Sequence, residues 1–424
     1  MKRSLKNWKG TAVVFGVDWG DSGKGRLVDD LSQNANIIAR YNGGSNTGHT
    51  VENEKGKFAF HIMPSGIFNQ KAICLVGRGV AVNLEVLILE MESLKKAGVG
   101  FKNLIIDEQS PLTMPWHILR DGIREKIRKS KIGTTGNGVG PTFADATERV
   151  GLKVKDLISK DLRDKIHWET EVQNKFYGLK VSRDTVYSRF SKLAKIVKPH
   201  IAKTTNILNN AHKKNQNILF EGAQGYFLDI DAGTYPFVTS SNPGVVGVWR
   251  SFDFHPQNIN HVIGITKAYT TRVGSGPMPT TMEEKTAAEI IEKGHEIGTT
   301  TGRVRTPGWL DTVLIKYANQ SNRLTSLAVT KLDVLSGQKK IKLCVGYKQN
   351  GKNTDYIPHD AELLSRVEPE YLEFEGWQDD ISSIRDFSKL PPNAKKYVNA
   401  IEKITGIPVK FISVGPKRGE VIYV

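Results

Sequence analysis

The sequence predicts an α/β fold with a mainly parallel central sheet flanked by helices. Short apolar, β-branched runs alternate along the chain with amphipathic stretches of helical period. Strands that are separated by helices form parallel sheets, because a parallel pair needs a long crossover connection. Glycine-rich polar loops also follow several of the apolar runs directly. Since open α/β sheets bind ligands at the carboxyl ends of their strands, these loops are candidate binding loops.

The expected elements follow one another in a regular order. We expect strands at residues 12–17, 37–41, 72–76, 104–107, 217–220, 261–266, 327–330, 341–345 and 409–413. Amphipathic periodicity predicts helices at residues 24–34, 84–97, 115–130, 184–213, 285–293, 309–318 and 393–405. The charged segment 152–215 has an almost wholly helical pattern and is interpreted as an excursion from the sheet. We therefore expect the 424 residues to form a single elaborated α/β domain with one helical excursion.

Composition narrows the class of protein. Hydrophobic residues make up 39% of the sequence, which is enough for a sizeable core. No apolar run reaches the ~18 residues that a membrane span needs, and the N-terminus shows no signal-peptide cleavage site. Cys74 and Cys344 each lie in a strand-like apolar run. We expect both to be buried reduced thiols, which predicts a cytoplasmic protein.

The formal net charge of +16 raises the alternative of a nucleic-acid-binding protein. The lysines are, however, dispersed over predicted helices, for example at residues 125–131 and 192–214. No basic stripe with interleaved aromatic residues accompanies them. We interpret the charge as solvated helix faces that also attract anionic substrates, and we expect neither a nucleic acid nor a membrane as partner.

The first candidate loop has the sequence Gly20-Asp21-Ser22-Gly23-Lys24-Gly25 and precedes Arg26. Its glycines let backbone N–H groups approach an anion, and the helix that begins at Lys24 directs its positive end at the loop. The spacing G-x-x-x-x-G-K-[ST] of a Walker A motif is absent. Taken alone, the loop fits either a phosphate site or an ordinary glycine turn.

Three further loops are rich in glycine and hydrogen-bond donors. The loop 43–50 contains a histidine that can donate a proton near neutral pH, and its polar part is Asn46, Thr47, Gly48, His49 and Thr50. The loop 133–141 contains Thr135, and the loop 221–225 contains Gln224. These loops indicate a polar site that they share.

Two loops in the second half of the chain carry charges. The loop 299–305 places three threonines beside Arg303 and Arg305, which is a suitable clamp for a carboxylate or a phosphate. The loop 330–333 ends a strand with Lys331 and Asp333. A carboxylate in that setting can accept hydrogen bonds from the N1–H and 2-amino groups of guanine, as in GTP-binding proteins.

Together these loops resemble those of the adenylosuccinate synthetase family. The matching blocks run in family order from about residue 12 to residues 413–416, and they are 20–25, 46–50, 133–141, 220–225 with 234–242, 267–274, 300–303 with 308–311, and 331–335. The resemblance therefore covers nearly the whole chain, and several of its blocks are long. It implies a P-loop-NTPase-like α/β fold and a GTP-dependent ligase.

The resemblance implies a reaction in two steps. GTP phosphorylates the 6-oxygen of IMP, and the amino group of L-aspartate then displaces the phosphate to give adenylosuccinate, as in de novo AMP synthesis. Asp21 matches the base that removes the N1 proton, and His49 matches the acid that stabilises the transferring phosphoryl group. Lys24 and Gln224 match groups that neutralise phosphate charge and fix the 6-oxygen region. Asp21 and the carbonyl group of Gly48 match Mg²⁺ ligands.

The same resemblance implies three sets of binding residues and a homodimer. The IMP set comprises Asp21, Ser22, Gly23, Lys24, Asn46, Thr47, Gly48, His49, Thr135, Arg149, Gln224, Thr239 and Arg303. The L-aspartate set comprises Thr299, Thr300, Thr301, Gly302, Arg303 and Arg305. The GTP set comprises Gly20, Asp21, Ser22, Gly23, Lys24, Gly25, Arg26, Gly48, His49, Thr50, Arg305, Lys331, Leu332, Asp333, Ser413, Val414 and Gly415. Arg149 matches an arginine that reaches the 5′-phosphate bound by a neighbouring subunit.

The chain departs from the family pattern directly after the expected base. The family usually has Glu where this chain has Ser22, and a shorter side chain there would open space for the 2-amino group of guanine. This leaves the alternative of a paralogue that acts on a 2-aminopurine nucleotide such as dGMP, as certain bacteriophage relatives do. Those relatives replace the aspartate itself, whereas Asp21 is retained here. Arginine is also usual at Asn137, Val304 and Thr306, and lysine at Arg26 and Ala146.

Two other classes of protein fit fewer of these features. A regulatory GTPase predicts a Walker A loop and a threonine-bearing switch, which the sequence lacks. A non-catalytic paralogue predicts that the catalytic side chains are lost, whereas the chain retains Asp21, Lys24, His49, Gln224, Arg303 and Asp333.

Overall fold

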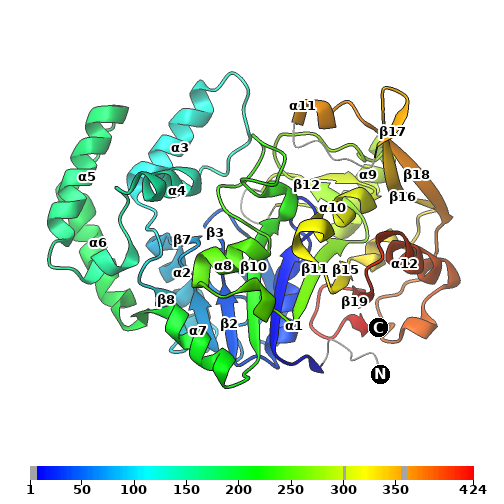
Figure 1. Ribbon diagram of the computed structural model, residues 1–424, viewed down its shortest axis with the longest axis horizontal. Helices are drawn as coiled ribbons and strands as arrows, with labels where there is room; N and C mark the ends of the chain where they lie inside the picture. Colours follow the sequence, from blue (N-terminus) through cyan, green and yellow to red (C-terminus); the bar gives the residue numbers. More distant parts are fainter. Residues whose placement is uncertain (1–6, 299–301, 355–360) are drawn as a thin grey trace.

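The computed structural model describes residues 7–298, 302–354 and 361–424. Its central sheet is built from β1 (Thr11–Gly16), β2 (Ile37–Arg40), β6 (Ile73–Val76), β8 (Leu104–Asp107), β9 (Ile201–Ala202), β10 (Ile218–Gly225), β11 (His261–Lys267), β15 (Ser326–Thr330), β19 (Val409–Ser413) and β20 (Val421–Tyr423). These ten strands lie in the order β20-β19-β15-β11-β1-β10-β2-β6-β8-β9 (Figure 1). All neighbours run parallel except β19 and β20. The predicted mainly parallel α/β fold is confirmed.

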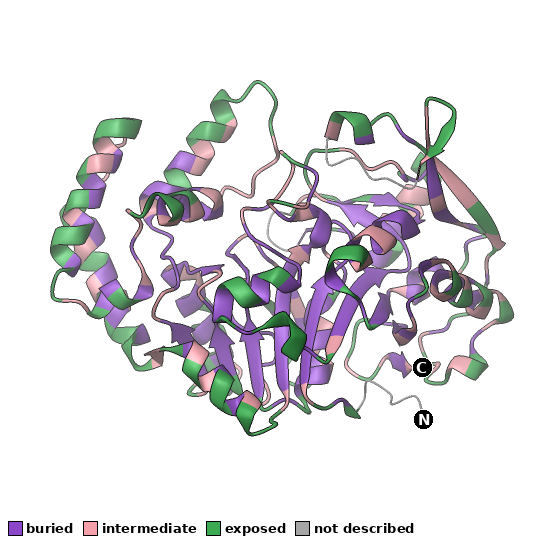
Figure 2. Cartoon of the chain, in the orientation of Figure 1, coloured by how far each residue is buried: buried purple, intermediate pink, exposed green. Residues whose placement is uncertain are grey.

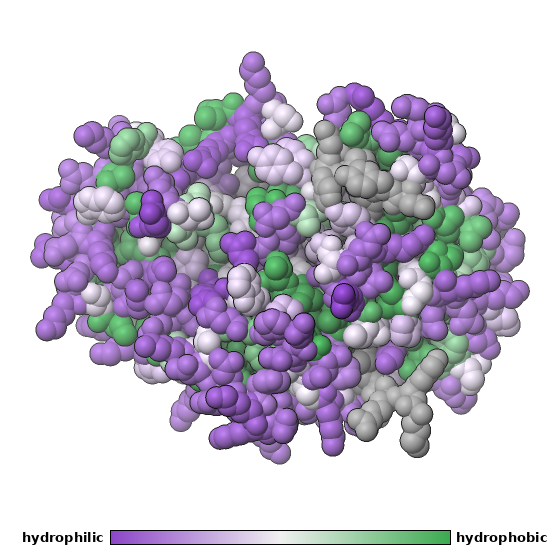
Figure 3. Space-filling view, viewed as in Figure 1, coloured by the Kyte–Doolittle hydropathy of each residue, from purple (hydrophilic) through white to green (hydrophobic). Residues whose placement is uncertain are grey.

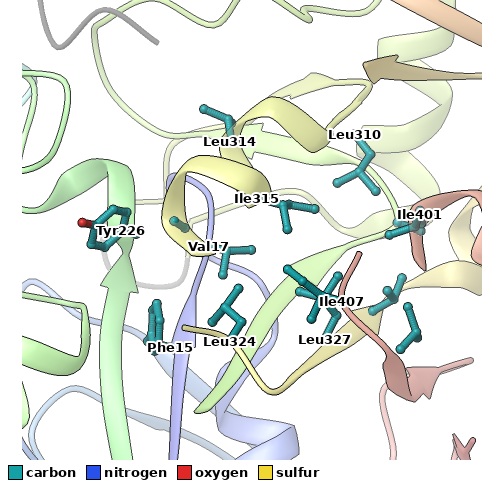
Figure 4. Close-up of a cluster of buried hydrophobic side chains, with 14 of the residues drawn as sticks. Phe15, Val17, Tyr226, Leu310, Leu314, Ile315, Leu324, Leu327, Ile401 and Ile407 are labelled. Atoms are coloured by element: carbon teal, nitrogen blue, oxygen red, sulfur yellow. The ribbon is translucent and has the colours of Figure 1, made fainter. Parts of the chain in front are cut away.

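The central strands read as continuous apolar runs because both faces of the sheet are covered. All six residues of β1 are buried, and Figure 2 shows the other central strands buried as well. Successive side chains of a strand point to opposite faces. Val13 and Phe15 accordingly join one core cluster, while Ala12 and Val14 join a second one. In the first cluster, Phe15 lies near Leu324 (Figure 4).

Helices flank this sheet and also extend beyond its edges (Figure 1). They are α1 (Lys24–Ser32), α2 (Leu84–Lys96), α3 (Pro115–Ile127), α4 (Val139–Glu148), α5 (Leu162–Tyr177), α6 (Arg183–Val197), α7 (Thr204–Lys213), α8 (Val245–Phe252), α9 (Glu284–Gly294), α10 (Thr312–Asn322), α11 (Ala361–Leu364) and α12 (Pro392–Thr405). Figure 1 shows α5 and α6 beyond the β8–β9 edge of the sheet, at the left. Within the described ranges, no helix combines the length and the apolar character that a bilayer crossing requires.

Two predicted helices are wrong in extent. The predicted helix 184–213 is interrupted, because Pro199 cannot continue a helix and disfavours a helical conformation at the residue before it. The chain instead forms α6, a short 3₁₀ turn at Lys198–His200, the edge strand β9 and then α7. The predicted helix 309–318 begins only at Thr312, because the Asp311 side chain caps it by accepting hydrogen bonds from the backbone N–H groups of Val313 and Leu314.

The predicted strand 341–345 belongs to a second sheet rather than to the central one. It is part of β16 (Lys340–Gln349), which pairs antiparallel with β17 (Lys352–Thr354) and β18 (Glu368–Glu375) and parallel with β14 (Leu310–Asp311). Smaller pairs are β3 (Gly43–Gly44) with β7 (Val80–Ala81), β4 (His49–Asn53) with β5 (Gly56–Phe60), and β12 (Thr270–Arg272) with β13 (Thr306–Gly308). Strand β10 continues to Gly225, so residues 221–225, which are predicted as a loop, form the end of this strand.

Candidate active site

A cavity of about 820 Å³ lies at the carboxyl ends of the central strands. Its walls come from the segments that follow β1, β2, β10, β15 and β19, as expected for an open α/β sheet. The predicted site residues that line it are Gly20, Asp21, Gly23, Lys24, Gly25, Arg26, Asn46, Thr47, Gly48, His49, Thr50, Thr135, Gln224, Thr239, Arg303, Arg305, Lys331, Asp333, Ser413 and Gly415. Residues that are up to 395 positions apart in a chain of 424 thus meet in a single cavity.

A few predicted residues lie elsewhere. Ser22, Arg149, Gly302, Leu332 and Val414 are absent from the cavity wall, and Thr299, Thr300 and Thr301 lie outside the described residues. Leu332 and Val414 are fully buried, because they are apolar and pack into the core. Arg149 is exposed at the end of α4.

The loop after β1 has the form of an anion cradle. Gly20 and Gly23 adopt φ values of 92° and 80°, and Asp21 adopts a φ of 55°, all in the left-handed region. No side chain of the described residues caps the N-terminus of α1, so its first N–H groups remain directed at the loop. Lys24 is the first residue of that helix, and it is buried. A phosphate group fits this arrangement of backbone donors and one ammonium group.

The buried carboxylate of Asp18 holds this loop in place, and no sequence motif predicted a role for Asp18. Its side chain is buried and accepts hydrogen bonds from the Gly20 N–H group (2.8 Å) and from the Ser22 hydroxyl group (3.0 Å). Burial raises the pKa of Asp18, although the charge of Lys24 opposes this shift. The Ser22 side chain is fully buried, donates to Asp18 and does not line the cavity.

Asp21 lies in the cavity and is held by an arginine. Arg305 Nε donates to Asp21 Oδ2 at 2.7 Å. Burial opposes ionisation of Asp21, but the charges of Arg305 and Lys267 outweigh it and lower the pKa of the carboxyl group. Asp21 is therefore ionised at neutral pH and can accept a proton.

His49 is oriented by a buried carboxylate that sequence reasoning did not single out. His49 Nδ1 lies 2.5 Å from Glu221 Oε1, and Glu221 also accepts from the Ser65 hydroxyl group (2.5 Å) and the Ser65 N–H group (2.8 Å). Burial lowers the pKa of His49 to about 4, although Glu221 opposes the shift. The imidazole is thus neutral at pH 7, and its Nε2 atom is buried without a hydrogen-bond partner among the described residues.

Gln224 connects the end of β10 to the loop 43–50, and Asn46 of that loop in turn contacts Thr239. Its Nε2 atom donates to Asn46 Oδ1 (3.1 Å) and to Thr47 Oγ1 (3.0 Å), while Asn46 Nδ2 donates to Thr239 Oγ1 (3.2 Å). Gln224 has a φ of 57° at the end of β10. Its neighbour Gly225 packs so closely that a Cβ atom there would lie 2.2 Å from the Asp18 carbonyl oxygen. A side chain at residue 225 would therefore separate the β1 and β10 loops.

The loop 133–141 is attached to α3 and to Arg303. Asp121 on α3 accepts hydrogen bonds from the Thr134 hydroxyl group and the Gly138 N–H group, both at 2.9 Å. Arg303 Nη2 donates to the Gly133 carbonyl oxygen at 3.0 Å. The cavity wall formed by Thr135 is thus positioned from two sides.

The opposite end of the cavity carries the lysine–aspartate pair. Lys331 has a φ of 57° directly after β15, and Asp333 follows in a 3₁₀ turn. Burial raises the pKa of Asp333 to about 6. Asp333 Oδ1 is buried and accepts no hydrogen bond from the part of the chain that the structure describes. This oxygen can accept from a ligand, as the N1–H group of guanine requires.

Glu296 is a further buried carboxylate that the motifs did not reveal. It ends the turn after α9 and contacts Lys267, Arg305 and Lys331, of which the last two line the cavity. A lone glutamate between a helix and a loop carries no recognisable sequence pattern. Only its position in the fold identifies it.

Comparison with known proteins adds independent information. A family model described as adenylosuccinate synthetase matches residues 13–422. The adenylosuccinate synthetase of Thermoanaerobacter sp. (strain X514) is 43% identical over 419 residues, covering 97% of this chain and 98% of that protein. The enzyme of the same name from Clostridium perfringens (strain 13 / Type A) is 44% identical over 420 residues, with the same coverage of 97% and 98%.

Solved structures also resemble the chain. Fully ligated adenylosuccinate synthetase from Plasmodium falciparum has a TM-score of 0.94 at 34% identity, covering 98% of this chain and 100% of that chain. Succinoaminodeoxyadenylate synthetase of cyanophage S-2L, bound to dGMP and dATP, has a TM-score of 0.64 at 16% identity, covering 98% and 95%. At that identity the phage protein shares the fold alone.

Proposed function

The chain belongs to the adenylosuccinate synthetase family, and on that premise we propose how its residues join L-aspartate to IMP. The family consists of GTP-using ligases of purine biosynthesis, and this chain is such a ligase. One observation carries the assignment of roles. The ionised Asp21, the imidazole of His49 and the ammonium group of Lys24 all line one cavity at the carboxyl ends of the central strands.

In the first step, Asp21 removes the N1 proton of IMP while the 6-oxygen attacks the γ-phosphorus of GTP. The bond between the γ-phosphorus and the β,γ-bridging oxygen breaks, and GDP leaves. The place of Asp21 at the cavity wall supports this role, because its ionised carboxylate is available there to accept a proton. Gln224 fixes the region of the 6-oxygen, and its hydrogen bonds to Asn46 and Thr47 hold it in place.

His49 stabilises the charge on the transferring phosphoryl group. In the free protein its Nε2 atom is unprotonated, because burial keeps the imidazole neutral and Nδ1–H faces Glu221. When GTP binds, its phosphate anion next to Nε2 raises the affinity of the ring for a second proton, which the ring takes up from solvent, and the carboxylate of Glu221 stabilises the resulting imidazolium ion. His49 then donates to the phosphoryl oxygen. Lys24 and the N-terminus of α1 neutralise the remaining phosphate charge.

In the second step, the amino group of L-aspartate attacks C6 and phosphate leaves. Arg303 and Arg305 bind the aspartate carboxylates, and Thr299 to Thr301 with Gly302 complete that loop. Lys331 and Asp333 bind guanine together with the backbone of residues 413–415. The Oδ1 atom of Asp333 supports the guanine site, because it is buried and accepts no hydrogen bond from the described residues.

The residues of the cavity fit a magnesium ion. Asp21 supplies a carboxylate oxygen and Gly48 a carbonyl oxygen, both at the cavity wall, and these are the hard oxygen ligands that Mg²⁺ prefers. Within the described residues no group of three or more metal-binding side chains occurs. Magnesium sites in nucleotide enzymes commonly use one or two carboxylates and complete their coordination with phosphate oxygens and water. When bound, Mg²⁺ neutralises charge on the phosphates of GTP.

The protein works as a homodimer in which Arg149 binds the 5′-phosphate of IMP in the partner's cavity. Arg149 is exposed and lies outside the cavity of its own chain, which supports a role in trans. The helices beside it also expose apolar side chains, namely Leu119, Ile123 and Ile127 of α3 and Trp168, Phe176 and Tyr177 of α5. Figure 3 shows scattered hydrophobic residues among hydrophilic ones in the region of these two helices. A second copy of the chain would cover them.

We also propose a single domain and a cytoplasmic location. Support for one domain comes from a core cluster that contains residues from Val13 to Ile422. The two cysteines are free, buried thiols, which fits a reducing compartment.

Turnover with defined nucleotides tests the proposal. The protein is incubated with GTP, Mg²⁺ and L-aspartate and either IMP or dGMP, and GDP and the succinylated nucleotide are quantified. We expect product with IMP, because the chain retains Asp21 and belongs to a family whose members are adenylosuccinate synthetases. Product with dGMP alone would establish the 2-aminopurine alternative, and no product with either nucleotide would refute the assigned chemistry. Asp21→Ala is expected to abolish turnover with little effect on the thermal unfolding midpoint, whereas His49→Ala is expected to abolish turnover and also to lower the midpoint, because it leaves the buried Glu221 without its partner.

A further inference from the structure

Glu296 is the acceptor of an unusually rich set of buried donors. Its side chain is fully buried and accepts from Lys267 Nζ (2.9 Å to each oxygen), Lys331 Nζ (2.7 Å), Arg305 Nη1 (2.7 Å) and the Tyr269 hydroxyl group (2.5 Å). Although burial raises its pKa, the charges of Lys267, Lys331 and Arg305 hold the pKa of Glu296 far below the usual range. A carboxylate that is paired in this way stays charged throughout the working pH range.

The partners of Glu296 belong to different parts of the site. Lys331 directly follows β15 and precedes Asp333, in the segment assigned to guanine. Arg305 ends the loop assigned to L-aspartate, and its Nε atom holds the base Asp21 at 2.7 Å. Lys267 ends β11 in the central sheet and is fully buried.

Glu296 also forms the base of the aspartate loop through its backbone. Its carbonyl oxygen accepts from the Arg305 N–H group at 2.9 Å, and residues 297 and 304 form an antiparallel bridge. The Gly298 N–H group donates to the Arg303 carbonyl oxygen at 2.8 Å. The stem of the loop is therefore attached to Glu296 by main chain as well as by side chain.

The geometry of one carboxylate links the two ligand sites. Lys331 contacts Oε1, whereas Arg305 contacts Oε2. The two oxygens are bonded to the same carbon atom, so a displacement of Lys331 that turns the carboxylate also moves the oxygen that fixes Arg305. Lys267 bonds to both oxygens and opposes other movements of the group.

We propose that Glu296 is a positioning residue that couples guanine-nucleotide binding at Lys331 to L-aspartate binding at Arg305. The proposal rests on the assignment of these two residues under the proposed function. A guanine nucleotide that orders Lys331 also fixes the carboxylate, and through it Arg305 and the stem of the aspartate loop. By reciprocity, bound aspartate strengthens nucleotide binding by the same factor. IMP does not contact Lys331 and reaches this link only through Asp21, which Arg305 also holds, so we expect its binding to change less than that of the other two ligands.

Steady-state kinetics of Glu296→Gln with IMP, GTP and L-aspartate test the first part. Gln keeps the shape of the side chain but removes its charge. We expect the KM values for GTP and for L-aspartate to rise together by about tenfold or more, with the KM for IMP changed less than about threefold. Glu289→Gln on α9 is the matched control, because Glu289 contacts Gln338 and not the cavity. Equal rises for all three substrates, or unchanged KM values, would overturn the proposal.

A second variant, Lys331→Met, isolates the coupling, and by itself it does not depend on the folding of Glu296→Gln. Lys331 is 27% exposed, so Lys331→Met is compatible with the fold. It is expected to raise the KM for GTP and also the KM for L-aspartate, the latter by about fivefold or more. In the Glu296→Gln background, adding Lys331→Met is expected to change the KM for L-aspartate by less than about twofold. A KM for L-aspartate that does not respond to Lys331→Met, or responds equally in both backgrounds, would overturn the proposal. If the wild type itself forms no product, the proposed function fails, which is a distinct result.

Discussion

At the scale of single residues, the sequence predicts the side chains that are proposed to touch ligands better than it predicts the buried side chains that position them. Asp21, Lys24 and His49 stand in glycine-rich blocks whose pattern pointed to phosphate chemistry. Asp18 and Glu296 are carboxylates outside those blocks, and Glu221 lies in one of them without a pattern that shows its role, so the importance of all three follows from their burial and their partners in the fold. Glu221 contacts His49 across 172 positions, a proximity that no local spacing encodes.

The pairing of His49 with Glu221 leads to a prediction about catalysis. Glu221→Gln keeps a hydrogen-bond acceptor for Nδ1–H but removes the charge that stabilises the imidazolium ion. We expect kcat to fall by about 10²-fold or more, as when general acid catalysis is lost, with the KM for GTP changed little. Rapid-quench or steady-state assays at pH 7 measure this. Ser65→Ala is the control, since it removes only a hydroxyl donor to Glu221 and leaves the charge, so its effect should be much smaller. A kcat for Glu221→Gln close to that of the wild type would contradict the assigned role of the pair.

Asp333 predicts a pH dependence of nucleotide affinity. Its pKa is raised to about 6 by burial, so the carboxylate is charged above that pH and becomes protonated below it. The protonated form loses an acceptor for the N1–H and 2-amino groups of guanine. We therefore expect the Kd for GDP, measured by titration calorimetry, to increase as the pH falls through about 6.

The variant Asp333→Asn serves as the control for that profile. It should bind GDP more weakly at every pH and lose the break near pH 6 that belongs to the carboxyl group. The amide can donate to the 2-oxo group of xanthine, so the preference should also move toward XDP. A break that persists in Asp333→Asn would assign the titration to another group.

At the scale of elements, hydrophobic periodicity predicted the positions of the strands well and the ends of the helices poorly. The strands at residues 104–107 and 409–413 were predicted at their observed bounds, because short buried runs between polar segments are unambiguous. The single helix predicted over residues 184–213 failed, because its amphipathic pattern continues across Pro199 although its backbone cannot. The predicted strand 341–345 exists within β16, but pattern alone could not tell which of the two sheets it joins.

A buried polar cluster joins the helices α3, α4 and α5 next to the loop 133–141, and it leads to a prediction about stability. Asp145 on α4 accepts from His117 Nε2 (3.0 Å), from Arg120 Nη1 (2.6 Å) and from Gln173 Nε2 (3.3 Å). Asp145→Ala leaves the Arg120 charge buried without its partner, and we expect a loss of about 3–5 kcal/mol in the free energy of unfolding of this region. Hydrogen exchange of α3 and α5, together with the thermal midpoint, measures it.

The exposed residue Asp184 provides the comparison for that experiment. It pairs with Arg163 at 3.7 Å, and both side chains are mostly exposed. Asp184→Ala should therefore change stability by less than about 1 kcal/mol. If the two variants were equally stable, the Asp145 cluster would not be what fixes these helices.

At the scale of the whole molecule, the cavity is assembled from both halves of the chain. Loops after β1 and β2 meet loops after β15 and β19 because these strands belong to one sheet whose carboxyl ends share an edge. That convergence could be predicted from the alternating pattern of strands and helices. The proposed role of Arg149 in the partner's site could not be predicted in this way, because the hydrophobic pattern of one chain does not show which surface a second copy covers.

The proposed dimer predicts that two inactive variants restore activity when they are mixed. Each complete site needs Asp21 from one subunit and Arg149 from the other. Arg149→Ala alone should raise the KM for IMP strongly, and Asp21→Ala alone should abolish turnover. In a random mixture of equal amounts, half of the dimers are hybrids, and each hybrid has one site with an intact Asp21 and an intact partner Arg149. About a quarter of all sites should then work at the wild-type rate, for a C₂ dimer that exchanges subunits freely. Recovery should follow the time course of subunit exchange seen by native mass spectrometry. If hybrids form but activity does not return, Arg149 acts within its own subunit.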